Sequence, residues 1–91
     1  MNLEVVMYYT CPVCGFPELE EPAYKGKSGS FEFCQCCAFQ FGKTDHDEHI
    51  SHEEWRARWI ADGMKWDEKT DYEPPENWNP RQQLLNIGVK V

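Results

Sequence analysis

Two pairs of cysteines with identical spacing restrict the fold of this chain more than any other feature of its sequence. Cys11 and Cys14 form one C-x-x-C pair, Cys34 and Cys37 form the other, and 19 residues separate the pairs. Each such turn presents two thiolates on one side of a tight backbone, and two turns complete a tetrahedron around Zn²⁺. The spacing therefore predicts one structural zinc ion held by these four sulfurs. Four thiolates leave no position for an activated water, so a catalytic metal is not expected.

The alternative is a pair of disulfides or a set of free buried thiols. The chain has five cysteines, an odd number that does not suit a complete disulfide framework. Residues 1–9 lack a basic segment and include Glu4, unlike a secretory signal. The longest apolar run, residues 5–9, is far shorter than the roughly 20 residues of a membrane span. We therefore expect a cytoplasmic protein with no membrane partner, whose paired cysteines bind metal.

The fifth cysteine, Cys36, leaves the register of the second pair open. A Cys34-x-Cys36 pair could replace Cys34-x-x-Cys37. We favour Cys37 because its spacing matches the first pair. Cys36 is then a spare thiol, either buried as a small apolar side chain or placed near the metal as a substitute ligand.

The residues around Cys14, in the first pair, indicate a tight turn. A redox dithiol would place its first cysteine at a helix N-terminus, which lowers the thiol pKa. Gly15 and Pro17 forbid a helix after the first pair, so thiol redox chemistry is disfavoured. Gly15 suits a backbone with positive φ. Ala38 follows the second pair, where the geometry is less clearly defined.

The composition indicates that the core needs the additional stability of a bound metal. Leu, Ile, Val and Phe number 17 of 91 residues, a share typical of disordered chains. Four Trp and four Tyr favour a folded chain, because each large ring buries about 150–250 Å² of surface. We expect a thin aromatic core that depends on the metal site.

The predicted fold is a small α+β metal-stapled domain. A zinc-ribbon-like β-hairpin carries the two C-x-x-C turns, which we call the first knuckle (residues 11–14) and the second knuckle (residues 34–37). One main helix and a short C-terminal helix follow the hairpin. We treat residues 1–91 as a single domain, with 1–44 as the zinc-ribbon-like half and 45–91 as the helix, an irregular strap and the final helix.

Local patterns in the first half predict short strands. Residues 3–10 form a predicted strand, and residues 18–22 and 30–34 form the predicted arms of a hairpin joined by a loop over residues 25–30. Phe31 and Phe33 alternate with Glu32, the pattern of a half-buried strand.

In the second half, end signals define two helices. Ser51 and Glu54 form a capping box, Ile50 and Trp55 suit a hydrophobic staple, and Gly63 suits the C-terminus of a helix over residues 52–62. Trp55 and Trp59 then share a face, more typical of core than of a ligand platform.

A polar strap with prolines follows over residues 66–77. Asn79 and Pro80 then predict the start of a short helix over residues 81–86, with Leu84 and Leu85 facing inward.

A second group of candidate residues lies just before the main helix. Asp45, His46, Asp47, Glu48 and His49 precede His52 and Glu53. An acid–base or second metal site can be built from such residues, but they match no named metal motif. Negative charge is favoured near a helix N-terminus, so a solvated acidic loop is the simpler interpretation. No stronger catalytic constellation is present, and we do not expect an enzyme.

The chain resembles the bacterial cysteine-rich CPCC family of small zinc-ribbon-like domains. The resemblance rests on YTCPVCGF (residues 9–16), LEEP (19–22) and FEFCQCCAF (31–39), ends near Asp45, and returns in outline at residues 50–63. Val13 stands where that family usually has a second adjacent cysteine, and Cys36 is an additional departure. The resemblance implies the same fold and a metal, but no reaction. It assigns the ligands one by one to Cys11, Cys14, Cys34 and Cys37.

The net charge of the chain distinguishes between nucleic-acid binding and protein binding. The net charge is −7, with five acids and three bases in residues 1–44 and eleven and six in residues 45–91. Nucleic-acid affinity depends on clustered Lys and Arg, so a nucleic-acid-binding zinc ribbon is the alternative rather than the first choice. We expect a small acidic protein-interaction module whose basic partner is a protein.

The expected binding surface is the helix at residues 52–62 with the strap after it. The competing interpretation is that the aromatic rings of the strap only hold the strap against the core. The strap and its flanking residues, 64–80 together, supply the aromatics Trp66, Tyr72 and Trp78, and the acids among them are Asp67, Glu68, Asp71, Glu73 and Glu76.

Overall fold

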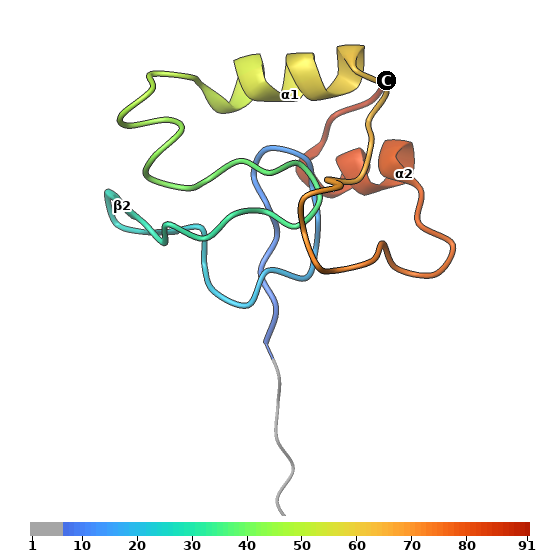
Figure 1. Cartoon of the computed structure of the whole chain (residues 1–91), viewed down its shortest axis with the longest axis horizontal. Helices are drawn as coiled ribbons and strands as arrows, with labels where there is room; N and C mark the ends of the chain where they lie inside the picture. The colour runs from blue at the N-terminus through green and yellow to red at the C-terminus, as the bar shows by residue number, and fades with distance from the viewer. Residues whose placement is uncertain (1–6) are drawn as a thin grey trace, which may run out of the picture.

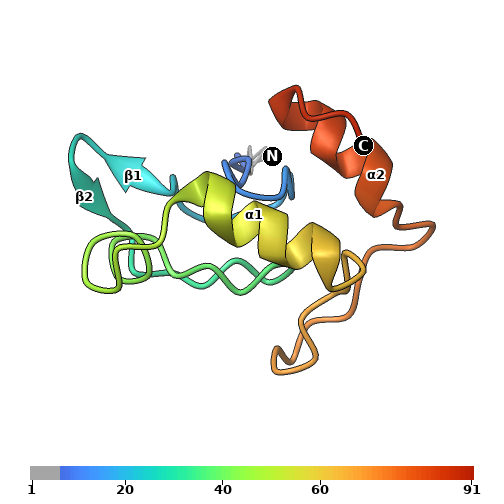
Figure 2. The ribbon, with the colours of Figure 1, turned by 90° about the horizontal axis from the view of Figure 1, so that it is seen from above.

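A computed structural model describes residues 7–91 (Figure 1). Its elements are β1 (Tyr24–Lys25), β2 (Ser28–Gly29), α1 (His52–Ala61), α2 (Pro80–Leu84) and the 3₁₀ turn η1 (Leu85–Ile87). Figures 1 and 2 place the β1–β2 hairpin and α2 at opposite ends, with the cysteine-bearing loops and α1 between them. The predicted α+β outline, one antiparallel hairpin and two helices, is confirmed. In the described range no helix has the length and apolar character to cross a bilayer.

The hairpin is not where the sequence predicted it. Tyr24 pairs with Gly29 and Lys25 with Ser28, inside and beside the expected loop. Residues 18–22 and 30–34 do not form a hairpin with each other; each segment instead pairs next to its own knuckle through an isolated bridge, Tyr9–Leu19 or Phe33–Gln40. Local closure of each knuckle therefore replaces pairing between the two predicted arms.

The predicted N-terminal strand falls partly outside the described residues. Residues 3–6 lie beyond them. Within residues 7–10, Tyr9 makes the single bridge to Leu19, with both backbone bonds at 2.9 Å. One bridging residue is less than the strand that the sequence predicted.

The core is small and aromatic, as the composition predicted. Phe31 and Phe33, expected on the buried face of a half-buried strand, are each 58% exposed, and this prediction is wrong. Phe39 and Phe41, on the far side of the second knuckle, are fully buried in their place. Other completely or almost completely buried apolar side chains are Val13, Phe16, Leu19 and Leu84.

Helix α1 begins and ends as predicted. The Ser51 hydroxyl accepts a hydrogen bond from the Glu54 backbone N–H at 3.0 Å, which satisfies one of the free donors of the first turn. At the other end Gly63 has φ 99°. Gly63 N–H donates to the Ile60 carbonyl (3.1 Å) and Met64 N–H to the Trp59 carbonyl (2.8 Å). These two bonds form a Schellman motif and end the helix.

Helix α2 is also capped as predicted, but it buries different residues. The Asn79 Oδ1 accepts from Gln82 N–H at 3.1 Å, and Pro80 occupies the first helical position. Leu84 is fully buried, whereas Leu85 is 53% exposed, so its predicted inward orientation is wrong. Gln83, on the other side of Leu84, is buried instead, and its amide contacts the first knuckle.

The strap over residues 66–77 has no helix or strand, as predicted. Trp66 packs edge-on against Phe16 and Trp78, both with ring centroids 5.4 Å apart. The Trp66 indole N–H also donates to the Tyr72 carbonyl at 2.9 Å. Two of the three strap rings therefore anchor the strap to the core.

Gly15 allows the first knuckle to approach α2 closely. Its φ is 84°, and a Cβ built there would overlap the backbone carbonyl oxygen of Gln83. Gly15 thus meets two requirements, a left-handed backbone and direct backbone contact. The sequence predicted the first requirement, and the structure adds the second.

We predict that Gly15→Ala destabilises the protein more than Gly26→Ala. Both glycines have positive φ, but a Cβ at Gly26 meets nothing within 4 Å. Gly26→Ala should cost about 1–2 kcal/mol from backbone strain alone, and Gly15→Ala should add the displacement of α2. Thermal or urea unfolding of both variants measures the difference, and equal losses would contradict this close approach.

Candidate metal centre

The four predicted ligands converge on one point. The Sγ atoms of Cys11, Cys14, Cys34 and Cys37 lie within 4.8 Å of one another, and all four side chains are buried. The Cys14–Cys34 sulfurs are 3.6 Å apart and the Cys11–Cys37 sulfurs 4.0 Å apart. A tetrahedral Zn–S₄ site with bonds of about 2.3 Å has sulfurs about 3.8 Å apart. These residues could therefore hold one metal ion.

The two knuckles share one backbone design. In the first, Cys11 N–H donates to the Phe16 carbonyl at 2.8 Å, and Gly15 N–H donates to the Cys11 carbonyl at 2.9 Å. In the second, Cys34 N–H donates to the Phe39 carbonyl and Ala38 N–H to the Cys34 carbonyl, both at 2.9 Å.

Ala38 has φ 66° and so adopts the left-handed backbone that Gly15 has in the first knuckle. An alanine rarely takes this conformation without support from its surroundings. The geometry that the sequence left less clearly defined is thus the same in both knuckles.

Burial makes the thiols of Cys14 and Cys37 poor anions without a cation. Burial raises the pKa of the Cys14 thiol well above its usual value, and the neighbouring cysteine side chains raise it further. Burial likewise raises the pKa of Cys37. A buried group of four thiolates needs a bound cation to offset its charge. The donor set therefore fits a divalent metal better than four free thiols.

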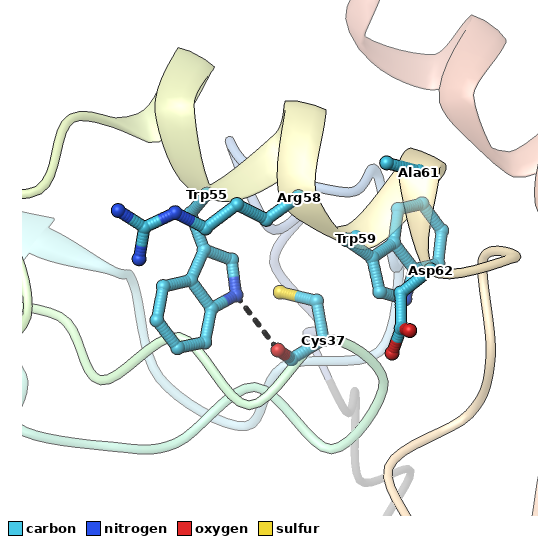
Figure 3. Close-up of a pocket in the computed structure, with 6 residues that line it drawn as sticks. All are labelled: Cys37, Trp55, Arg58, Trp59, Ala61 and Asp62. Atoms are coloured by element: carbon cyan, nitrogen blue, oxygen red, sulfur yellow. Dashed lines mark hydrogen bonds between the residues drawn. The ribbon is translucent and has the colours of Figure 1, made fainter.

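Helix α1 binds the backbone of both knuckles. The Trp55 indole N–H donates to the Cys37 carbonyl at 2.8 Å (Figure 3). The Arg56 guanidinium donates to the carbonyls of Val13 at 2.6 Å and Pro12 at 2.9 Å. The guanidinium also brings a positive charge to the first knuckle. Four thiolates with one divalent ion carry about −2, so this charge favours the loaded site.

Helix α2 and η1 bind the first knuckle from another side. The Gln83 amide donates to the Cys14 carbonyl at 3.1 Å, and the Asn86 amide donates to the Gly15 carbonyl at 2.9 Å. The Trp78 indole N–H donates to Gln83 Oε1 at 2.8 Å and fixes the amide in place. Sequence reasoning missed these residues, because 69 positions separate Gln83 from Cys14 and no local pattern marks the contact.

Cys36 is buried next to the centre but is not one of the four converging sulfurs. Its side chain is fully buried. Its Sγ accepts a hydrogen bond from the Gln83 amide at 3.4 Å. Among the residues the structure describes, the converging sulfur group contains Cys37 and not Cys36. The geometry therefore favours the C-x-x-C register.

One side of the centre is more open than the rest. Cys37 is 5% exposed, whereas Cys11, Cys14 and Cys34 are completely buried. It borders an open cavity of about 580 Å³ under α1, lined also by Trp55, Arg58, Trp59, Ala61 and Asp62 (Figure 3). Metal ions and solvent would reach the sulfurs most readily from this side.

The second candidate group is only partly brought together. Tyr24, which sequence reasoning missed, donates its hydroxyl to Asp45 Oδ2 at 2.6 Å and lies 2.7 Å from His52 Nε2. His46 and His49 are exposed and take no part in this arrangement. Burial opposes the charged form of Asp45, but hydrogen bonds from Tyr24 and the Gly42 N–H lower its pKa. The cluster ties β1, the acidic loop and the start of α1 together.

Comparisons with protein-family models, with curated proteins and with solved structures found no match to this chain. The resemblance to the CPCC family therefore stays a prediction that rests on the quoted knuckle residues.

Substitution of Cys36 and Cys37 tests the register. We predict that Cys36→Ser keeps the bound metal, because the Cys36 sulfur bonds to Gln83 outside the group of four. Cys37→Ser should lose affinity or recruit Cys36, since it removes one of the four sulfurs. Metal retained after dialysis against a chelator compares the two variants. Loss from Cys36→Ser with retention in Cys37→Ser would reverse the assignment.

Proposed function

We propose that the chain is a structural zinc-binding domain, with one Zn²⁺ held by Cys11, Cys14, Cys34 and Cys37. The convergence of four buried sulfurs carries this proposal. Four-sulfur tetrahedral sites suit zinc or iron, and zinc adopts this geometry without an electronic preference of its own. All four positions are filled by the protein, which supports a structural rather than a catalytic metal.

The metal identity has a direct test. We predict one zinc per chain after purification, with a first shell of sulfur alone at about 2.3 Å. Elemental analysis measures the stoichiometry, and zinc-edge X-ray absorption measures the shell. Iron in place of zinc, nitrogen or oxygen in the shell, or a metal-free protein with disulfides would each contradict the proposal.

We further propose that this domain is an acidic protein-interaction module. The chain carries a net charge of −7. On the strap, Glu68, Asp71, Glu73 and Glu76 are exposed. Within residues 7–91, none of these four carboxylates has a basic group within 4.0 Å. Unpaired surface carboxylates supply a field that would guide a basic protein partner to this face.

The strap aromatics contribute unequally to such a face. Trp66 and Trp78 pack together, and Trp66 also packs on Phe16, so pinning the strap accounts for both rings. Tyr72 is 55% exposed and remains available for contact. The proposed strap surface is therefore acidic with one aromatic side chain, rather than the three that the sequence indicated.

Nucleic-acid binding remains the weaker alternative. Of the basic side chains near the knuckles, Arg56 is committed to the Pro12 and Val13 carbonyls. Lys25 and Lys27 are exposed on the β1–β2 hairpin but lie among more numerous acids along the chain. Such a surface would neutralise few phosphates.

Neutralising the strap tests the interaction. Glu68→Gln, Asp71→Asn and Glu73→Gln together should weaken capture of a protein partner several-fold and flatten its salt dependence, while thermal stability stays unchanged. The matched control is Glu18→Gln, Asp47→Asn and Glu48→Gln, which removes the same charge from exposed positions outside the strap and α1. Quantitative capture by the metal-loaded proteins measures the effect. Equal capture by both triple variants would remove the strap as the binding face.

A further inference from the structure

Two large aromatic side chains are exposed two positions apart in the sequence. Phe31 and Phe33 are each 58% exposed, with only Glu32 between them. The other exposed large apolar residues of the described chain are separated from them: Met7, Tyr8, Tyr72, Leu85 and Val91. In a chain with so few apolar residues, two rings left in solvent are unusual and suggest contact with another molecule.

Backbone geometry makes Phe31 more unusual still. Phe31 N–H donates to the Phe41 carbonyl at 2.8 Å, and Phe41 N–H donates to the Glu32 carbonyl at 3.2 Å. Two residues thus oppose one, as in a β-bulge whose first position normally takes glycine. Phe31 holds that position with φ 62°. Neither local backbone preference nor burial accounts for a phenylalanine here.

A cavity adjoins Phe33. It measures about 570 Å³ and lies between the second knuckle and the strap. Phe33, Ala38 and Trp55 provide apolar walls, and strap residues 67 and 69–71 complete the lining. This volume falls in the range of ligand-binding clefts and could accept an apolar side chain from a partner.

Charge around this surface specifies what would bind. Asp67 and Asp71 line the cavity with a single basic residue, Lys69. Near the rings, Glu32 has no basic partner within 4.0 Å among the described residues. Burial raises the pKa of Glu32, and the nearby Glu21 and Glu20 carboxylates raise it further. A Lys or Arg from a partner would relieve this repulsion.

We propose that Phe31, Phe33 and the adjoining cavity form a docking surface for a protein segment that carries an apolar side chain flanked by Lys or Arg. This rests on the proposed protein-binding function and extends it from the strap to a defined site. The two rings supply the contact area of an interface centre, and the carboxylates on both sides select basic flanks. An anionic membrane surface is disfavoured, because the same carboxylates would repel it.

Peptide titrations followed by NMR test this proposal. The zinc-loaded, ¹⁵N-labelled protein is titrated with a peptide of alternating Lys and Leu, and separately with a peptide of alternating Lys and Ser. The Lys–Leu peptide should bind at least about tenfold more tightly. It should also shift the amides of residues 31–33 and the Trp55 indole N–H. Equal affinity for the two peptides would mean that only charge is recognised and would overturn the proposal.

Two variants separate docking from folding. Phe31→Gly and Phe33→Thr should each weaken Lys–Leu binding about tenfold. Phe31→Gly should also leave the melting temperature unchanged or raise it, because glycine suits φ 62°. Leu85→Gln, at a similarly exposed position on η1, is the control and should bind as the unmodified chain does. Binding unchanged in both phenylalanine variants would overturn the proposal even if Phe33→Thr is less stable.

The outcomes also distinguish this inference from the proposed function. Residues 72–76 of the strap do not line the cavity. Peptide-induced shifts confined to these residues, and lost when Glu73→Gln and Glu76→Gln are combined, would overturn the docking surface and leave the acidic face standing. Absence of binding by either peptide would count against both. Sedimentation analysis tests whether a second copy of this chain is the occupant. A dimer that Phe31→Gly dissociates would show that the second copy covers the rings, and would overturn the proposal.

Discussion

Four buried sulfurs converge at the centre, on two backbone turns to which both helices and the strap are hydrogen-bonded. Helix α1 binds the knuckle carbonyls through Trp55 and Arg56. Helix α2 binds them through Gln83. The strap joins through the Asp67 N–H, which donates to the Cys36 carbonyl at 2.9 Å. All these hydrogen bonds are accepted by backbone carbonyls of the knuckles. The positions of α1, α2 and the strap therefore depend on the arrangement of the knuckles around the four sulfurs.

This dependence is consistent with the small core. The chain has 17 Leu, Ile, Val and Phe residues, and two of its five phenylalanines lie in solvent. A structural zinc contributes about 10–16 kcal/mol of binding free energy at neutral pH, which is comparable to the whole stability of a typical domain, about 5–15 kcal/mol. A bound metal would therefore decide whether this chain folds, rather than adjust a fold that is already stable.

Features that depend on neighbouring residues could be predicted from the sequence. The knuckle turns, the Ser51 and Asn79 caps and the Gly63 helix end follow from local hydrogen bonding and backbone preference. The group of four cysteines follows from repeated spacing. Local pattern failed where distant segments decide the outcome. Phe31 and Phe33 alternate like a buried strand, yet closure of the second knuckle gives the buried positions to Phe39 and Phe41.

The same limit applies to the residues that surround the candidate site. Arg56, Gln83 and Tyr24 contact partners between 21 and 69 positions away, and nothing in their immediate sequence marks those contacts. Leu85 was misplaced because the first knuckle lies on the side of Leu84 that carries Gln83, and the local sequence does not show which side that is.

Amide hydrogen exchange with and without metal tests the central dependence most directly. In the metal-loaded protein, the account predicts protected amides in α1 and α2 as well as in both knuckles. After removal of the metal by a chelator under reducing conditions, protection should be lost in all of these segments together, and it should return when one equivalent of zinc is added. Persistent protection of α1 and α2 in the metal-free protein would show that the helices fold independently and would contradict the central role of the sulfur cluster.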